Sequence, residues 1–293
     1  EDNKTFVHLS NLLLASGVSA PKVYSVDYDQ GFMLLVDLGD DLYLPALLHF
    51  QRNDDIDSSE ALYSQAIDAL ILIQSGLDKD RLPAFTVEKL LSEMQLFTTW
   101  FCEIFLSFEV DEAGSALCDS TFRWLAEQLS EQHQVAVHRD YHSRNLMMLD
   151  SSKFGADCGP GVIDFQDAVS GSYTYDLVSL LRDCYISWPR LQVEGWASLY
   201  LVKAQSAGLL AGCSEAQLLR DMNIAGLQRN LKVIGIFARL SIRDNKSQYL
   251  ADIPLVIRYF LDISAEFEEM AEFRAWLITE VLPPAKAKLQ MEP

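Results

Sequence analysis

One interruption in a long helical pattern constrains the fold of this chain more than any other feature. Apolar residues at three- and four-residue spacing predict helices over residues 58–77, 87–106 and 112–132. The pattern stops after residue 132 and resumes near residue 173. Between these points lie three short apolar runs with turn-rich connections, at residues 135–137, 146–149 and 161–163. We therefore predict three short β-strands inside a mainly helical domain, and we expect a functional site where charged residues gather among them.

The first forty residues predict a smaller unit of a different kind. Apolar residues over 6–14 favour a helix that ends near Gly17, where a C-terminal glycine is expected. Two β-like runs follow, residues 22–26 and residues 32–38, and the turn between them contains Gly31. Two short strands joined by such a turn predict an antiparallel hairpin.

A lobe boundary is predicted at Gly39, because this glycine and the two aspartates after it break the β pattern. The chain has 293 residues, which is more than one compact core usually uses. We therefore predict an N-terminal lobe over residues 1–39 and a helical C-terminal lobe, carrying the site, over residues 40–293. At the start of the first long helix, Ser58 or Ser59 is the predicted N-cap.

The charge of the chain limits the partners that it can have. Asp and Glu number 42 against 23 Lys and Arg, so the formal net charge is −19. Nucleic acids and anionic membranes attract clustered basic residues, so neither is an expected partner. The sequence shows no signal-peptide pattern and no charge-free apolar run of about 18 residues. Its five cysteines are widely spaced and never form a Cys-x-x-Cys pair, which predicts reduced thiols and a cytoplasmic location.

The loop between the first two predicted strands carries a characteristic set of polar residues. It begins His138-Arg139-Asp140, and Asn145 follows after four further residues, which matches the kinase catalytic-loop pattern. The third predicted strand ends at Asp164. Phosphoryl transfer needs a divalent metal to neutralise the triphosphate, and Mg²⁺ prefers carboxylate and amide oxygens. We therefore predict Asn145 and Asp164 as Mg²⁺ ligands and Asp140 as the base that accepts the proton of the substrate hydroxyl.

These motifs resemble those of the aminoglycoside phosphotransferase and choline kinase superfamily. The resemblance rests on HRDYHSRN at residues 138–145, GVIDF at 161–165 and YDL at 175–177. Four longer stretches resemble the bacterial anomeric kinases of N-acetylmuramate and N-acetylglucosamine in particular: HRDYHSRNLM at 138–147, DFQDA at 164–168, TYDLVSLLRDCY at 174–185 and GLQRNLKVIGIFARL at 226–240. The resemblance spans nearly the whole chain.

This resemblance implies a protein-kinase-like, two-lobed α+β fold with a truncated N-terminal β lobe and a mainly helical C-terminal lobe. It implies a kinase that uses ATP and Mg²⁺ to phosphorylate the anomeric hydroxyl of an amino sugar in cell-wall (peptidoglycan) recycling. Backbone groups of Val36, Asp37 and Leu38 are expected to hold adenine at the hinge between the lobes. His142 is expected either near the transferring phosphate or as a packing residue of the loop, and Asp176 is expected to tie the loop down.

Contacts to the acceptor sugar are predicted less directly. Arg182 and Arg229 are candidates for binding the sugar or the lactyl carboxylate of N-acetylmuramate, because guanidinium groups bind carboxylates in a fixed geometry. Arginines of this kind are more often surface or salt-bridge residues. Arg144, inside the loop, is a candidate to face phosphate or sugar. Tyr141 and Asp167 lie beside the predicted base and metal ligand in the sequence and are further candidates.

The sequence departs from the kinase pattern in two ways. Gln166 follows Asp164-Phe165 where protein kinases have glycine, which favours a small-molecule kinase. A glycine-rich phosphate loop and a Val-Ala-Ile-Lys-like strand are missing, and by resemblance these elements are expected before Glu1. Two alternatives stay open. One is a phosphotransferase for an aminoglycoside, choline or homoserine-like acceptor, because a net charge of −19 suits a cationic substrate. The other is a non-catalytic, pseudokinase-like binding protein.

Overall fold

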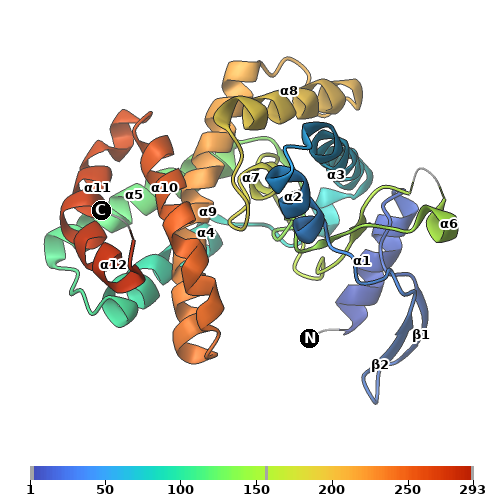
Figure 1. Cartoon of the computed structure of the whole chain (residues 1–293), viewed down its shortest axis with the longest axis horizontal. Helices are drawn as coiled ribbons and strands as arrows, with labels where there is room; N and C mark the ends of the chain where they lie inside the picture. The colour runs from blue at the N-terminus through green and yellow to red at the C-terminus, as the bar shows by residue number, and fades with distance from the viewer. Residues whose placement is uncertain (1–2, 156–157, 292–293) are drawn as a thin grey trace. The chain divides into compact units, whose positions relative to one another are not determined.

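The computed structural model describes residues 3–155 and 158–291 (Figure 1). Two compact units make up the chain. The first consists of Glu1–Ala84 and His133–Leu219, and the second consists of Phe85–Gln132 and Arg220–Pro293. The lobe boundary at Gly39 stays a prediction. In the described ranges, no helix combines the length and the apolar character that crossing a membrane requires.

The first unit opens with the helix and the hairpin that the sequence predicts. Helix α1 (Asn3–Ala15) ends just before Gly17, which takes a φ of 86° that suits glycine at a helix C-terminus. Strands β1 (Val23–Asp27) and β2 (Phe32–Leu35) pair antiparallel, and Figure 1 shows this hairpin beside α1. The hairpin is confirmed, but the predicted strand 32–38 is three residues too long.

The remaining helical segments of the first unit are α2 (Tyr43–Arg52), α3 (Ile56–Gly76), a short 3-10 turn at Lys79–Arg81, α6 (Ser151–Phe154), α7 (Tyr175–Leu181) and α8 (Arg190–Ser206). Helix α3 confirms the predicted helix 58–77, but it begins two residues earlier. The N-cap is therefore Asp55 rather than Ser58 or Ser59, and its Oδ1 accepts a hydrogen bond from the Ser58 N–H at 3.1 Å. A carboxylate at this position also suits the positive end of the helix dipole.

Four short strands flank the predicted site. Strand β3 (Gln134–Val137) pairs antiparallel with β6 (Val169–Ser172), and β4 (Leu146–Met147) pairs antiparallel with β5 (Gly161–Val162). The three predicted strands are present, but they belong to two separate two-stranded sheets. Strand β6 was not predicted, because its sequence Val-Ser-Gly-Ser contains no apolar run. The 138–145 loop consequently connects one small sheet to the other.

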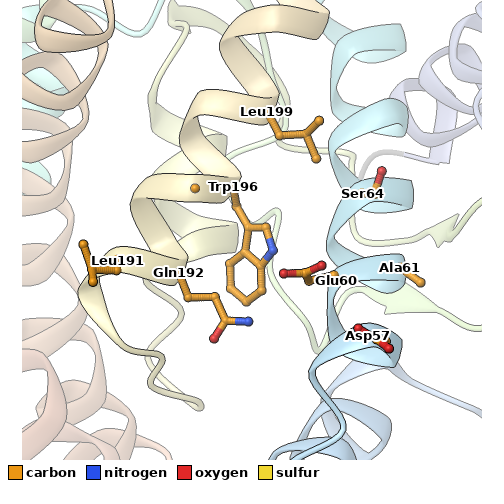
Figure 2. Close-up of a pocket in the computed structure, with 9 residues that line it drawn as sticks. Asp57, Glu60, Ala61, Ser64, Leu191, Gln192, Trp196 and Leu199 are labelled. Atoms are coloured by element: carbon orange, nitrogen blue, oxygen red, sulfur yellow. The ribbon is translucent and has the colours of Figure 1, made fainter.

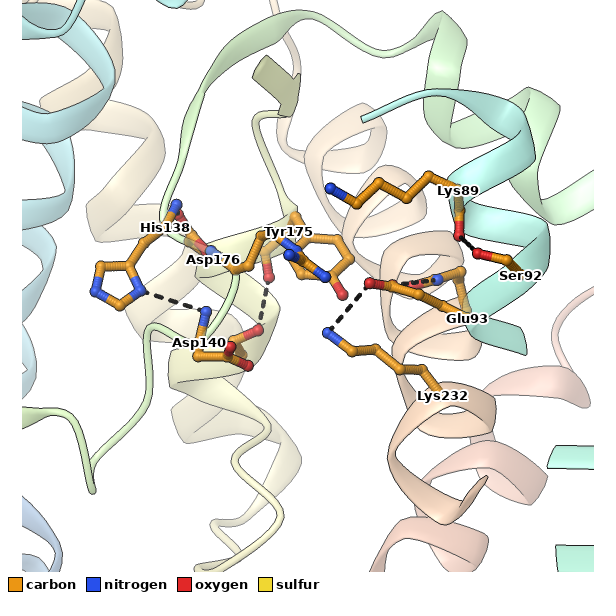
Figure 3. Close-up of polar contacts among 11 residues, drawn as sticks. Lys89, Ser92, Glu93, His138, Asp140, Tyr175, Asp176 and Lys232 are labelled. Carbon is orange, nitrogen blue, oxygen red and sulfur yellow. Dashed lines mark hydrogen bonds and ion pairs between the residues drawn. The ribbon is translucent and has the colours of Figure 1, made fainter. Parts of the chain in front are cut away.

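The described residues of the second unit form helices and the loops that connect them, without a β-strand. Its segments are α4 (Val87–Leu96), a π-helical stretch at Phe97–Phe105, α5 (Glu112–Glu131), most of α9 (Glu215–Arg243), a 3-10 turn at Ser247–Asp252, α10 (Ile253–Ser264), a 3-10 turn at Glu268–Met270, α11 (Ala271–Trp276), a π-helical stretch at Leu277–Val281 and α12 (Leu282–Leu289). Buried phenylalanines fill its core, among them Phe97, Phe122 and Phe273. A buried ion pair joins Lys232 of α9 to Glu93 of α4 at 3.7 Å (Figure 3).

Candidate active site

The 138–145 loop is fixed at its start by a buried carboxylate. Asp176 lies in the first turn of α7 and has no exposed surface. Its Oδ2 accepts a hydrogen bond from the His138 N–H at 2.6 Å, and its Oδ1 accepts one from the Arg139 N–H at 2.9 Å (Figure 3). These bonds agree with the predicted role of Asp176 in tying the loop down. Arg139 adopts a φ of 79°, which is uncommon for a residue with a side chain. The chain therefore reaches Asp140 in a backbone geometry that α7 stabilises.

His138 connects the loop to the strand that delivers Asp164. Its Nε2 lies 3.0 Å from the carbonyl oxygen of Ile163, and its Nδ1 accepts a hydrogen bond from the Asp140 N–H at 3.3 Å. Burial lowers the pKa of His138 from its ordinary 6.5 to about 4, so the ring is neutral at pH 7. A neutral imidazole has one donor and one acceptor nitrogen, which matches these two contacts. His138 therefore supports the loop.

The structure brings the predicted base and the two predicted metal ligands close together. Asn145 Nδ2 donates to the backbone oxygen of Asp140 at 2.9 Å and to Asp164 Oδ2 at 3.3 Å. The N–H of Ile163, the residue before Asp164, donates to the Asn145 carbonyl oxygen at 3.1 Å. Because Nδ2 makes these contacts, the amide can offer its Oδ1 to a cation.

Asp164 lies in a strained backbone conformation, with a φ of 66°. Six non-glycine residues of the described chain have a positive φ, and two of them, Arg139 and Asp164, belong to this site. Strain of this kind persists only where surrounding contacts impose it, and it is frequent at functional sites. Gln166 Nε2 donates to Asp164 Oδ1 at 2.8 Å. Gln166, which the sequence marked only as a departure from glycine, thus orients the carboxylate.

The oxygen ligands at this site suit a magnesium ion that is shared with a nucleotide. One carboxylate and one amide oxygen are hard ligands, and Mg²⁺ usually completes its coordination with water and substrate phosphates. Asp164 is exposed, so its carboxylate is accessible to such partners. Within the described ranges, no group of three or more His, Cys, Asp and Glu side chains could hold a metal ion. The residues therefore fit a metal that arrives with phosphate ligands better than one held by the protein alone.

The middle of the loop is held by two other elements of the first unit. Tyr141 is fully buried, and its hydroxyl donates to the carbonyl oxygen of Ala66 in α3 at 2.7 Å. This geometry favours a role in supporting the loop over direct contact with a substrate. Ser143 is also buried, and its N–H and hydroxyl both donate to Asp183 Oδ2, at 3.0 and 2.5 Å. The sequence analysis did not identify Asp183, because nothing in its local pattern indicates a partner 40 residues away.

The predicted adenine-binding segment lies between β2 and α2. The Val36 N–H donates to the Lys22 carbonyl oxygen at 2.8 Å, so this donor is already in use. Asp37 is exposed, and its carboxylate accepts a hydrogen bond from the backbone two residues further on. Leu38 is buried, and a Cβ added to Gly161 would lie only 3.0 Å from its side chain. The segment therefore packs closely on β5, the strand that leads to the predicted metal ligand.

The remaining predicted residues lie at different places in the chain. His142 and Arg144 are partly exposed within the loop itself. Asp167 is exposed, three residues beyond the predicted metal ligand, and Arg182 is partly buried at the C-terminus of α7. Arg229 is buried in α9 and belongs to the second unit. Their roles toward an acceptor stay predictions.

Two cavities in the first unit have linings that contain none of the predicted site residues. The larger has a volume of 610 Å³ and lies between α3 and α8. Figure 2 shows Trp196 in its wall, between Gln192 of α8 and Glu60 of α3. The smaller has a volume of 280 Å³ and includes Cys158 and Asp68 in its lining. The 138–145 loop, rather than either cavity, therefore remains the candidate active site.

Comparison with known proteins identifies related chains over most of this sequence. The model of the phosphotransferase enzyme family matches residues 1–211. An N-acetylmuramate/N-acetylglucosamine kinase of Pseudomonas putida is 36% identical over 287 residues, which cover 98% of this chain and 80% of that protein. A protein of the same name from Pseudomonas aeruginosa is 39% identical over 272 residues, which cover 93% of this chain and 76% of that protein.

Solved structures resemble this chain in fold at low sequence identity. The ethanolamine kinase of Plasmodium vivax superposes with a TM-score of 0.61 at 12% identity, covering 88% of this chain and 72% of that one. A choline kinase of Streptococcus pneumoniae superposes with a TM-score of 0.57 at 11% identity, covering 88% and 80%. An ADP-bound aminoglycoside phosphotransferase gives a TM-score of 0.56 at 15% identity, covering 89% and 82%. These likenesses confirm the predicted protein-kinase-like α+β fold.

Proposed function

Because the chain belongs to the phosphotransferase enzyme family, we propose that it transfers the γ-phosphoryl group of ATP to the anomeric hydroxyl of N-acetylmuramate or N-acetylglucosamine. The names of the relatives that are 36% and 39% identical support this acceptor. The observation that carries the reaction is that Asn145 Nδ2 donates to both the backbone oxygen of Asp140 and the carboxylate of Asp164, because these bonds bring the residue of the proposed base next to both proposed metal ligands.

Asp140 would act on the acceptor. Its carboxylate would orient the anomeric hydroxyl and accept the proton as the oxygen attacks the γ-phosphorus, a contribution of roughly 10²–10⁴-fold in rate. The Asp140 backbone is bonded to the His138 ring and to the Asn145 amide, so the base cannot shift without disturbing both neighbours. Catalysis in this reaction class rests on holding the hydroxyl in line with the phosphoryl group together with electrostatic stabilisation of the phosphate charge.

Asp164 and Asn145 would hold the metal of the metal–nucleotide complex. Bound Mg²⁺ supplies positive charge that neutralises the phosphate oxygens. Gln166 and Asn145 each donate a hydrogen bond to the Asp164 carboxylate, which keeps it in one orientation. Val36, Asp37 and Leu38 would contact adenine through backbone groups other than the Val36 N–H, which donates to Lys22. His142 would lie near the transferring phosphate.

The acceptor would be bound by side chains outside this centre. We propose Arg182 and Asp167 as contacts to the sugar, with the guanidinium group of Arg182 binding the lactyl carboxylate of N-acetylmuramate. Arg144 would face the phosphate groups of the nucleotide. Tyr141 would support the loop beneath these contacts. Since the reaction consumes ATP and returns free amino sugars to use, we place it in the cytoplasm and in cell-wall recycling.

The test is release of ADP by the full-length protein in the presence of Mg²⁺ and a panel of acceptors. N-acetylmuramate and N-acetylglucosamine should be turned over, whereas the methyl glycoside of N-acetylglucosamine should not, because its anomeric oxygen is blocked. Asp140→Asn should lower kcat by about 10²–10⁴-fold while the affinity for Mg²⁺·ATP stays within about threefold.

Other outcomes would place the activity elsewhere in the family. Turnover of the blocked glycoside would move the phosphorylated hydroxyl away from the anomeric position. Turnover of choline or an aminoglycoside alone would indicate a cationic acceptor, which the net charge of −19 suits. Binding of nucleotide without turnover of any acceptor would support the pseudokinase-like alternative.

A further inference from the structure

The segment that follows α7 contacts the 138–145 loop at a second point, away from Asp176. Asp183 is 1% exposed and accepts hydrogen bonds from the Ser143 N–H at 3.0 Å and the Ser143 hydroxyl at 2.5 Å. Its other oxygen accepts a hydrogen bond from the Tyr185 N–H at 3.2 Å. A buried carboxylate is stable only when hydrogen bonds replace its hydration, and these three donors supply them. The loop and the 183–185 segment are therefore joined by a compact set of charge-assisted bonds.

The side chain of Tyr185 also contacts the 138–145 loop. The guanidinium carbon of Arg144 lies 3.6 Å from the centre of the Tyr185 ring, which is a close cation–π stack. The His142 ring meets the same ring edge-on, with centroids 5.6 Å apart and planes at 75°. One aromatic ring therefore orients the two side chains on either side of Ser143.

The position of Ser143 in the loop makes this contact relevant to chemistry. Asp176 fixes the backbone before Asp140, whereas Asp183 fixes the backbone between Asp140 and Asn145. The Asn145 N–H donates to the carbonyl oxygen of residue 142 at 2.8 Å, so the turn that ends at the predicted metal ligand includes Ser143. A shift of Ser143 would therefore change the spacing of base and metal ligand.

We propose that Asp183 and Tyr185 are positioning residues for phosphoryl transfer, a proposal that rests on the proposed function. Asp183 sets the separation of Asp140 and Asn145 through Ser143. Tyr185 preorganises the guanidinium group of Arg144 to contact the triphosphate of ATP, the anionic substrate group that is present whichever acceptor is used.

The Tyr185 part is tested with a matched pair of variants, Tyr185→Phe and Tyr185→Leu. Phenylalanine keeps the ring and should stay within about twofold of the parent protein. Leucine removes the ring and should weaken Mg²⁺·ATP, measured by direct titration without acceptor, about threefold to thirtyfold, which is the range of a cation–π contact. In the leucine variant, the KM for the sugar should change less than the KM for ATP. Its melting temperature should match that of the phenylalanine variant. Equal nucleotide affinity of the two variants would refute this role.

The Asp183 part is tested through its partner. Asp183→Ala should lower kcat more than about tenfold, and Asp183→Asn, which can still accept from the Ser143 N–H, should recover part of that loss. If Ser143 carries the effect, the double variant Ser143→Ala/Asp183→Ala should lose no more activity than Asp183→Ala alone. If the activity losses of Ser143→Ala and Asp183→Ala add up in the double variant, Asp183 does not act through Ser143. A lower melting temperature of Asp183→Ala with unchanged kcat would show that Asp183 only stabilises the fold.

Failure of this proposal can be told apart from failure of the proposed function. The nucleotide titrations need no acceptor, and the comparison of Asp183 variants can use any alcohol that the parent protein turns over. If the parent protein turns over no amino sugar, the choice of acceptor is wrong, while the nucleotide titrations of the Tyr185 variants still decide the role of the ring. A Tyr185→Leu variant that binds ATP like the parent contradicts the positioning role whatever the acceptor.

Discussion

Acidification from pH 7 to pH 5 is expected to destabilise the folded chain through one buried imidazole. His138 is 2% exposed, and burial lowers its pKa from 6.5 to about 4. The nearby carboxylates of Asp140 and Asp164 oppose this shift, and the neighbouring His142 adds to it. Well above pH 6.5 the ring is neutral in both the folded and the unfolded chain, so it adds no pH dependence there.

The sign and size of the effect follow from the two pKa values. Between pH 6.5 and pH 4 the unfolded chain binds a proton that the folded chain does not, so the free energy of unfolding falls as the pH falls. Each pH unit in this window removes about 1.4 kcal/mol. The loss attributable to His138 is about 2 kcal/mol at pH 5 and about 3 kcal/mol once the pH is below 4.

The assay is urea unfolding of the parent protein and of His138→Gln, followed by circular dichroism at several pH values between 5 and 7.5. Glutamine keeps an N–H donor for the Ile163 carbonyl oxygen but cannot titrate in this range. Subtracting the variant from the parent removes the contribution of the many carboxylates, which both proteins share. The difference in unfolding free energy should shrink by about 2 kcal/mol from pH 7 to pH 5.

If the glutamine variant folds poorly, the pKa of His138 can be measured directly in the parent protein. The ring signals of His138 in the folded parent protein can be followed by NMR, because the other four histidines are at least partly exposed. If the His138 ring takes up its proton near pH 6.5 in the folded protein, burial does not lower its pKa and the prediction is wrong. A stability difference between parent and variant that does not change with pH would contradict the prediction as well.

Three further changes probe the site and the second unit. Asp164→Ala should weaken Mg²⁺·ATP binding more than about tenfold in a direct titration, because it removes the carboxylate ligand; unchanged affinity would place the metal elsewhere. Asp176→Ala should lower the free energy of unfolding by about 2–5 kcal/mol in urea, because it leaves a buried and a part-buried N–H donor of the loop without their acceptor. Gly235→Ala should destabilise by about 1–3 kcal/mol, because the added Cβ would lie 2.3 Å from the Leu96 backbone. Gly195→Ala is the control for it: this Cβ meets nothing within 4 Å, so thermal melting should show a gain of about 0.5–1 kcal/mol from helix propensity.

Local patterns in the sequence were sufficient for most elements of the first unit. The spacing of apolar residues predicted α3, and the glycine after α1 and the turn between β1 and β2 marked their ends. Strand β6 and helix α2 were not predicted. The Val-Ser-Gly-Ser stretch of β6 and the ten residues of α2, which include Pro45, show no clear apolar periodicity. Such segments take their structure from the partners they pack against rather than from their own residue preferences.

For the candidate site, local sequence motifs were enough to identify the residue types and their spacing. Asp140, Asn145 and Asp164 could be chosen because phosphoryl transfer needs a base and hard oxygen ligands, and because the pattern His-Arg-Asp with Asn four residues later is a compact local signal. The order of these residues is fixed by the covalent chain, so no tertiary information was needed to propose them.

The contacts that hold those residues in place could be found only in the folded structure. The bonds from Asp183 to Ser143 span 40 residues, and the contact of Asn145 with Asp164 spans 19. The positive φ at Asp164 likewise depends on the contacts around it, since aspartate tolerates this conformation better than most residues but rarely adopts it. Hydrogen bonds between distant residues depend on how the strands and helices pack, and a linear pattern of residue types contains no direct record of that packing.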